Sequence, residues 1–153
     1  ELKKYPRCRY CGMERAKFSH TRDLLVYEDD SVEGTCSIHC SAISLSLNMD
    51  RGPKAIYAGD AGAAGDIKPL VLVDKAFYVL DPSKTGTMTK ASKFAYADKA
   101  KADAAAAGEA AAKAGAKVVG FNEALKSAYL GMAEDTIMLR MRRGEMRKKA
   151  KGG

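Results

Sequence analysis

The feature that most constrains this chain of 153 residues is the placement of its four cysteines, all within the first 40 positions. They form a C-x-x-C pair, Cys8 and Cys11, followed by a C-x-x-x-C pair, Cys36 and Cys40. Such clustering favours metal binding in a reducing compartment, whereas disulfides compete with metal in an exported protein. We therefore expect sulfur chemistry to fasten the N-terminal half of the chain.

The first pair continues into Gly12 and Met13, which gives the run C-x-x-C-G-M. In extended backbone the side chains of Cys11 and Met13 would point to the same face, and Gly12 leaves the backbone free to turn. A thiolate beside a thioether suits Cu(I) better than zinc, which rarely takes methionine. The motif therefore predicts a Cu(I) site, while a disulfide or a zinc knuckle beside a core methionine remains an open alternative.

A structural zinc site is the strongest of these alternatives, because the ligand number and spacing both fit. Its candidate ligands are Cys8, Cys11, Cys36 and Cys40, with His39 as a substitute. A redox-active pair at Cys8 and Cys11 is less favoured, since no strand precedes it and Gly12 follows it.

One methionine stands apart from the other six. Met88 lies among small polar residues in Thr85–Thr89, where a core methionine is not expected. A loop methionine next to a flexible glycine, Gly86, can reach a neighbouring site. By contrast, Met49, Met132 and Met138 fall at apolar helix positions and are interpreted as packing residues.

The formal net charge of +7 is concentrated near the C-terminus. That stretch has seven cations, opposed only by Glu145: Arg140, Arg142, Arg143, Arg147, Lys148, Lys149 and Lys151. Such a tail is suited to anionic lipid or an acidic partner, although a solvated basic terminus is the commoner case. We do not expect nucleic-acid binding, because no aromatic residues are interleaved for base stacking.

Catalysis is not expected, because the chain shows no hydrolytic triad, P-loop or dinucleotide fingerprint and has two histidines. The apolar patterning predicts an α+β fold of two small strand-strand-helix domains plus a C-terminal helix. The expected domains are 1–66, 67–135 and a basic helical tail at 136–153. The expected strands are 22–28, 32–37, one or two within 70–80, 94–96 and 117–121, and the expected helices are 38–49, 97–116 and one from Asn122.

Four blocks of sequence together resemble one known family. They are C-x-x-C-G-M at 8–13, C-S-x-H-C at 36–40, G-x-M-x-K-x-x-K-F-A at 86–95 and F-N-E-A-L at 121–125. This combination is similar to the NosL-type accessory lipoproteins of nitrous oxide reductase, over residues 5–135. The resemblance implies an exported, often lipid-anchored, copper-handling protein, with the lipid-bearing cysteine expected before residue 1.

The resemblance also implies a site and partners. Family ligands map onto Cys11, Met13 and Met88, and the copper would pass to nitrous oxide reductase with a membrane ABC-type complex as docking partner. Cys8, Cys36 and Cys40 would form a second metal site or disulfides. In this hypothesis the chain is a periplasmic Cu(I) metallochaperone whose ligands come from both domains, with His20 as a fourth or gating ligand. The rival hypothesis is a zinc-stabilised binding module with a basic docking tail.

Overall fold

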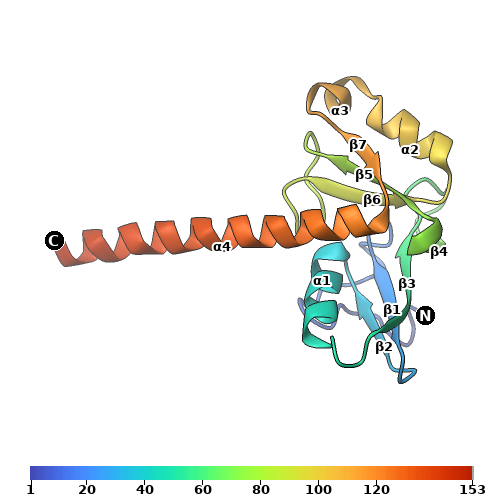
Figure 1. Ribbon diagram of the computed structural model, residues 1–153, viewed down its shortest axis with the longest axis horizontal. Helices are drawn as coiled ribbons and strands as arrows, with labels where there is room; N and C mark the ends of the chain where they lie inside the picture. The colour runs from blue at the N-terminus through green and yellow to red at the C-terminus, as the bar shows by residue number, and fades with distance from the viewer. Residues whose placement is uncertain (153) are drawn as a thin grey trace.

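The computed structural model describes residues 1–152, which form two small antiparallel sheets and four α-helices (Figure 1). The first sheet has the strand order β2-β1-β3-β4 and the second β6-β5-β7. The strands are β1 Asp23–Tyr27, β2 Val32–Thr35, β3 Pro53–Gly59, β4 Leu70–Leu72, β5 Phe77–Asp81, β6 Ser92–Tyr96 and β7 Lys117–Val119. The helices are α1 Ile38–Leu47, α2 Lys99–Ala106, α3 Glu109–Lys113 and α4 Phe121–Gly152, with a 3-10 turn at Val73–Lys75. This arrangement confirms the predicted α+β class.

The first sheet is built around β1, which pairs with β2 on one side and β3 on the other. Its alternating pattern places Leu25 and Tyr27 in the core, each with no exposed surface. The turn to β2 is closed by Asp29, whose carboxylate accepts a 3.0 Å hydrogen bond from the backbone N–H of Ser31. Helix α1 follows β2 directly, so the C-terminal end of β2 lies beside the first turn of α1.

The strand β3 is missing from the sequence-based prediction, which expected no strand between residues 37 and 70. Alanines and a terminal glycine give this segment a low strand propensity, and Pro53 is tolerated because it is the first residue. Pairing with β1 along five register positions overrides that propensity. Gly59 is required here, because a Cβ would lie 2.1 Å from the carbonyl oxygen of Ser19.

The second sheet is covered by two short helices where the sequence predicted one helix at 97–116. The break falls at Gly108, which is the N-cap of α3. Helix α2 begins after Asp98, whose side chain accepts a 2.8 Å hydrogen bond from the N–H of Ala100. Each helix has a buried alanine, Ala102 in α2 and Ala111 in α3, and α2 contacts all three strands of the sheet. Small side chains let these helices approach the strands closely.

Helix α4 joins the two sheets and then leaves them (Figure 1). Ala124 and Ala128 are buried in a core that contains residues of both sheets, and the hydroxyl of Tyr129 donates a 2.8 Å hydrogen bond to the carbonyl of Ala42 in α1. The distal half projects beyond the body of the molecule. No helix within residues 1–152 is long and apolar enough to cross a membrane. The division at residues 66 and 67 stays a prediction, although β4, at 70–72, pairs into the first sheet.

Candidate metal centre

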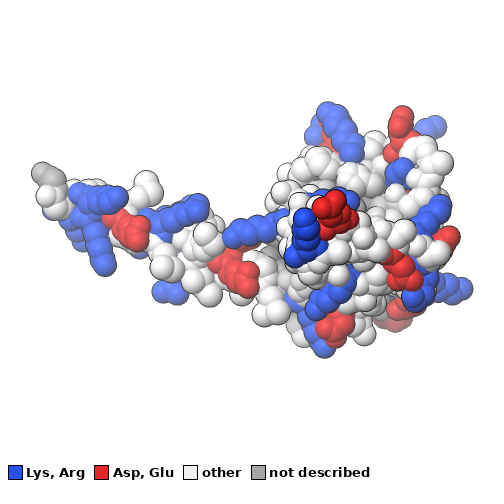
Figure 2. Space-filling view, turned by 90° about the horizontal axis from the view of Figure 1, so that it is seen from above, with Lys and Arg blue, Asp and Glu red and all other residues white. Residues whose placement is uncertain are grey.

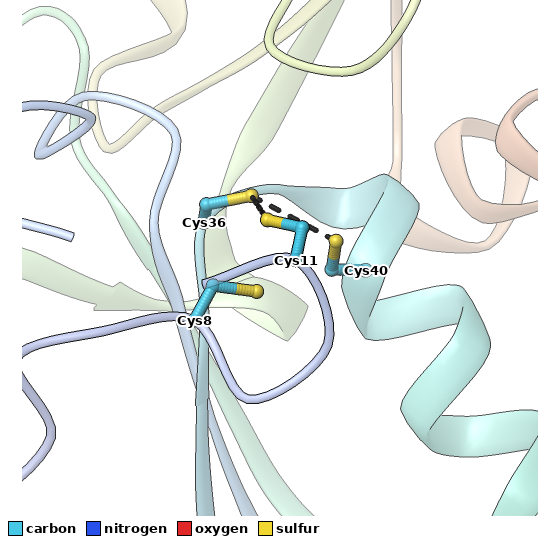
Figure 3. A group of neighbouring side chains, drawn as sticks. All are labelled: Cys8, Cys11, Cys36 and Cys40. Atoms are coloured by element: carbon cyan, nitrogen blue, oxygen red, sulfur yellow. Dashed lines mark hydrogen bonds between the residues drawn. The ribbon is translucent and has the colours of Figure 1, made fainter. Parts of the chain in front are cut away.

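The four cysteine sulfurs converge at one point (Figure 3). All four Sγ atoms lie within 4.8 Å of one another. The Sγ of Cys36 is 3.4 Å from that of Cys11 and 3.8 Å from that of Cys40. All four residues are free thiols. The structure therefore brings together the ligands that the sequence suggested for a four-cysteine site.

Cys8 and Cys11 are positioned by a tight turn between Arg7 and Glu14, which form an isolated antiparallel bridge. The N–H of Cys8 donates to the carbonyl of Met13 at 2.8 Å, and the N–H of Gly12 donates to the carbonyl of Cys8 at 2.9 Å. Gly12 has φ +76°, a left-handed conformation that favours glycine. The run from Cys11 to Met13 is thus turned, in contrast to the extended backbone considered from sequence.

Cys36 and Cys40 are positioned by the junction of β2 with α1. Cys36 follows the last strand residue, Ser37 is the N-cap of α1, and Cys40 lies in the first helical turn. Both cysteines are almost fully buried. The positive end of the helix dipole faces this region and favours negative charge on a nearby thiolate.

A buried arginine holds these segments around the first sheet. Arg15 has no exposed surface, and its Nε donates to the carbonyl of Thr35 at 3.0 Å, directly before Cys36. Its guanidinium also donates to the carbonyl of Asp23 at 2.6 Å and to the carboxylate of Glu1 at 2.6 Å. The backbone of the cysteine turn is joined to β2 by a 3.1 Å hydrogen bond from Arg9 N to Gly34 O. These contacts fix both cysteine pairs to the same sheet end.

The four thiols influence one another electrostatically. Hydrogen bonds from Cys36 and Cys40 lower the pKa of the Cys8 thiol well below its ordinary value, against the opposing effect of burial. The same contacts with Cys36 and Cys8 raise the pKa of Cys40, and burial adds to the increase. The lowered pKa of Cys8 favours its thiolate in the folded protein. A bound metal ion would replace the remaining thiol protons.

A buried carboxylic acid, Asp23, lies behind the cluster. Asp23 is 1% exposed, and burial raises its pKa to about 7 while a 2.6 Å hydrogen bond from the hydroxyl of Ser41 opposes the increase. Ser41 follows Cys40 in α1 and also contacts Thr35 through their hydroxyl groups at 2.7 Å. The sequence analysis did not identify Asp23, because aspartate is seldom fully buried.

The burial of the four cysteines is unequal. Cys8, Cys36 and Cys40 are buried, whereas Cys11 is exposed at the surface. Met13 is half-buried and packs against the three buried cysteines. The centre therefore has one accessible side, at Cys11, with a thioether next to its enclosed part.

Met88 is placed close to this region by its loop. The Oγ1 of Thr21 lies 2.9 Å from the Oγ1 of Thr87 and donates to the carbonyl of Cys36 at 2.9 Å. Met88 itself has φ +62°, uncommon for a residue with a side chain, and is 43% exposed. It lines a pocket of about 230 Å³ together with His39. Direct coordination of the same ion by Cys11, Met13 and Met88 stays a prediction.

The two histidines have different surroundings. The Nδ1 of His39 is 3.8 Å from the Sγ of Cys40, and burial lowers the pKa of His39. The ring of His20 packs edge-on against Phe94, with 5.3 Å between ring centroids. His20 as a fourth or gating ligand stays a prediction, as does His39 as a substitute ligand.

The cationic residues of the C-terminal stretch lie on the projecting part of α4 (Figure 2). Side chains there are largely exposed, and within residues 1–152 no salt bridge involves an arginine or lysine after residue 126. A role of Arg140, Arg142, Arg143, Arg147, Lys148 and Lys149 in docking stays a prediction.

Two of the sulfur separations are close to the value for tetrahedral coordination. A zinc ion with four bonds of about 2.3 Å to sulfur would separate those sulfurs by about 3.8 Å. The Sγ of Cys36 lies 3.4 Å from that of Cys11 and 3.8 Å from that of Cys40, near this value, and no two of the four sulfurs are more than 4.8 Å apart. Four sulfur ligands of this kind suit soft and borderline ions such as Cu(I) and Zn²⁺.

The two-sheet fold and the four-thiol centre define a small α+β protein with a candidate site for a thiophilic metal. The chain belongs to the NosL family, whose family model matches residues 1–129. This confirms the resemblance drawn from the sequence motifs and agrees with the prediction that the chain is not an enzyme.

Among solved structures, the copper chaperone NosL from Shewanella denitrificans is similar to this chain. It is 23% identical in sequence, and the match has a TM-score of 0.58 and covers 76% of this chain and 87% of that one. At this identity the likeness concerns the fold. No curated protein sequence matches the chain.

Proposed function

We propose that this protein is a Cu(I) metallochaperone that binds the ion at its cysteine centre and delivers it to a copper enzyme. The observation that carries the proposal is the convergence of four sulfur atoms within 4.8 Å, three of them buried and one exposed. Membership of the NosL family supports it, as does the fold shared with a copper chaperone.

The unequal burial suggests how binding and release are combined. Cys8, Cys36 and Cys40 hold the ion in a site from which water is excluded, and soft thiolates give it high affinity. Cys11 is the ligand that an incoming thiol or thioether reaches first, because it is exposed. Exchange at Cys11 opens the coordination sphere without unfolding the buried part of the centre.

The thioethers extend this arrangement. Met13 packs on the buried cysteines, and Met88 lies in a loop tied to the carbonyl of Cys36 through Thr21. The family resemblance predicts Cys11, Met13 and Met88 as the ligands that hold Cu(I). We infer that both methionines bind the ion during exchange at the cysteine centre. Thioethers are neutral and bind Cu(I) more weakly than thiolates, which favours transfer to an acceptor.

The acceptor and the location follow from the same proposal. The copper enzyme is nitrous oxide reductase, reached in the periplasm with a membrane ABC-type complex as docking partner. An N-terminal lipid anchor in the full-length form and the basic part of α4 would keep the carrier near the membrane, where cations attract anionic headgroups.

Anaerobic titration with Cu(I) against a chromophoric chelator tests the proposal. The reduced wild-type protein should retain Cu(I), Cys36→Ser should lose affinity by at least tenfold, and Met13→Leu should lose less. Met49→Leu is the matched control, because Met49 is an exposed methionine outside the centre. Equal affinities in all four proteins would contradict the proposal.

Zinc is the second candidate ion, because a closed site of four thiolates is the usual arrangement of structural zinc. In that case the protein would be a zinc-stabilised binding module that docks through its basic helix. Adding Cu(I) to the zinc-loaded protein separates the two candidates. Release of one zinc ion per chain supports the copper carrier, whereas retained zinc with Cu(I) left on the chelator supports the module.

A further inference from the structure

A pocket of about 230 Å³ lies between α1, the β5–β6 loop and α4, beside the cysteine centre. Its lining contains one imidazole and two thioethers, His39, Met88 and Met132. These three groups come from three separate elements and offer uncharged ligand atoms. Sulfur and imidazole nitrogen ligands in one partly enclosed space suit a soft monovalent cation.

His39 connects this pocket to the cysteine centre. Its Nδ1 lies 3.8 Å from the Sγ of Cys40, and the same residue lines the pocket. The second ring nitrogen, Nε2, can then act as a ligand independently of Nδ1. An ion leaving Cys40 would therefore meet an imidazole next.

The charged groups of the pocket compensate one another. Lys90 and Lys93 line it together with Glu134 and Asp135. The ammonium of Lys90 is 3.8 Å from the carboxylate of Asp135, and that of Lys93 donates to the carbonyl of Ala91 at 3.2 Å. The lysines are thus engaged, and the two acids offset their charge.

We propose that His39, Met88 and Met132 form a second soft-metal site without thiolates, which takes Cu(I) or Ag(I) beside the four-cysteine centre. The inference rests on the proposed copper function, and it adds Met132, which the sequence analysis interpreted as a packing residue. The backbone of Met88 is held at φ +62°, and such conformations persist where the surrounding structure enforces them. A thiolate-free site would hold the ion more weakly than the cysteines and so suits release.

Silver titration followed by NMR of ¹³C-methyl-labelled methionines tests this site, with Ag(I) as the redox-inert probe. After the cysteine centre is filled, a further equivalent of Ag(I) should shift the methyl signals of Met88 and Met132. The signals of Met49 and Met146, both exposed elsewhere, should stay unchanged. Met132→Leu and His39→Gln should each bind one equivalent fewer than wild type, while Met49→Leu binds the wild-type number.

The titration distinguishes failure of the second metal site from failure of the proposed copper function. If Ag(I) and Cu(I) fill the cysteine centre but the Met88 and Met132 methyls never shift, the second site is overturned and the proposed function stands. If neither ion binds the cysteines, the proposed function fails. In that case, shifts of both methyls at the first equivalent of Ag(I) would still support the second site, and their absence would overturn it as well.

Discussion

The cysteine end of the first sheet and the helical layer on the second sheet are stabilised in different ways. Around the cysteines the interior is rich in polar groups, with Arg15, Arg22, Asp23 and Glu33 all buried. On the second sheet, α2 packs on the strands with the buried Ala102, and the short α3 beside it buries Ala111. The first region depends on specific hydrogen bonds and sulfur chemistry, and the second on close packing of small side chains. Substitutions that remove a hydrogen-bonding group or a thiol should therefore destabilise the first region. Substitutions that enlarge a buried side chain should destabilise the second.

The largest effect is expected from Cys36→Ser with metal present. Cys36 has no exposed surface and contacts the sulfurs of Cys11 and Cys40. A ligand at a thousand times its Kd stabilises a protein by about 4 kcal/mol, so the wild type should gain at least this much on metal loading and the variant little. Thermal unfolding with metal and with a chelator measures both gains. An equal gain in the two proteins would show that Cys36 is not a ligand.

The next largest effect is expected from Arg15→Met. The substitution leaves the carbonyls of Thr35 and Asp23 without this buried donor, at a cost of about 3–5 kcal/mol, while the carboxylate of Glu1 keeps its ion pair with Arg22. Arg7→Met is the matched control, because the side chain of Arg7 is 65% exposed and its ion pair with Glu14 is worth less than about 1 kcal/mol. Urea denaturation measures both values. Similar losses in the two variants would remove the distinction between the regions.

A pH-dependent effect is expected from Asp23→Asn in the metal-free protein. The pKa of Asp23 is about 7 in the folded state, above its ordinary value of 3.8. Between pH 4 and pH 7 this carboxyl is therefore more protonated in the native state than in the unfolded state. Wild-type stability from this group therefore falls as pH rises from 4 to 7 and is constant above 7. The asparagine variant lacks this loss and should gain more than about 1 kcal/mol relative to wild type across that range. A pH-independent difference in the free energy of unfolding would contradict the buried acid.

The packing of α2 on the second sheet should be destabilised by a larger side chain. Ala102→Leu inserts three carbons where α2 packs on β5, and overpacking of this kind costs about 1–3 kcal/mol. Ala104→Leu is the control, because Ala104 is exposed on the same helix. Denaturation should show a clear loss for the first and almost none for the second. Metal affinity should be unchanged in both, and a loss of affinity in Ala102→Leu would mean that the regions are coupled.

The smallest effect on stability is expected from the double variant Arg143→Gln, Arg147→Gln. Both residues are exposed on the projecting part of α4, so the free energy of unfolding should change by less than about 0.5 kcal/mol. Flotation with vesicles that contain an anionic phospholipid should show weaker binding than for the wild type. Unchanged vesicle binding would exclude these arginines from membrane docking.

Spacing alone was informative about the cysteine centre. The C-x-x-C and C-x-x-x-C pairs suggested a four-cysteine zinc site as the alternative to a Cu(I) site of Cys11, Met13 and Met88, because such spacings place sulfur pairs on a turn and on one helix face. The residues behind the centre were not predictable, since burial of Arg15 and Asp23 depends on contacts between segments far apart in the chain. Charged residues are otherwise expected at the surface.

The secondary structure was likewise predictable where it depends on local sequence, and not where it depends on contacts between distant segments. The apolar patterns predicted most strands and α1, because these segments have strong local preferences. Strand β3 has weak local preferences and forms through its pairing with β1 and β4. Met132 packs against the core, as its helical spacing predicted, and its place beside the pocket depends on the loop that carries Met88.

X-ray absorption at the metal edge identifies the atoms bound to the ion, with the full chain reduced and loaded anaerobically with one equivalent of Cu(I). Binding at the four cysteines predicts a first coordination shell made of sulfur alone, which loses sulfur neighbours in Cys36→Ser. A first shell dominated by nitrogen or oxygen in the wild-type protein would contradict it.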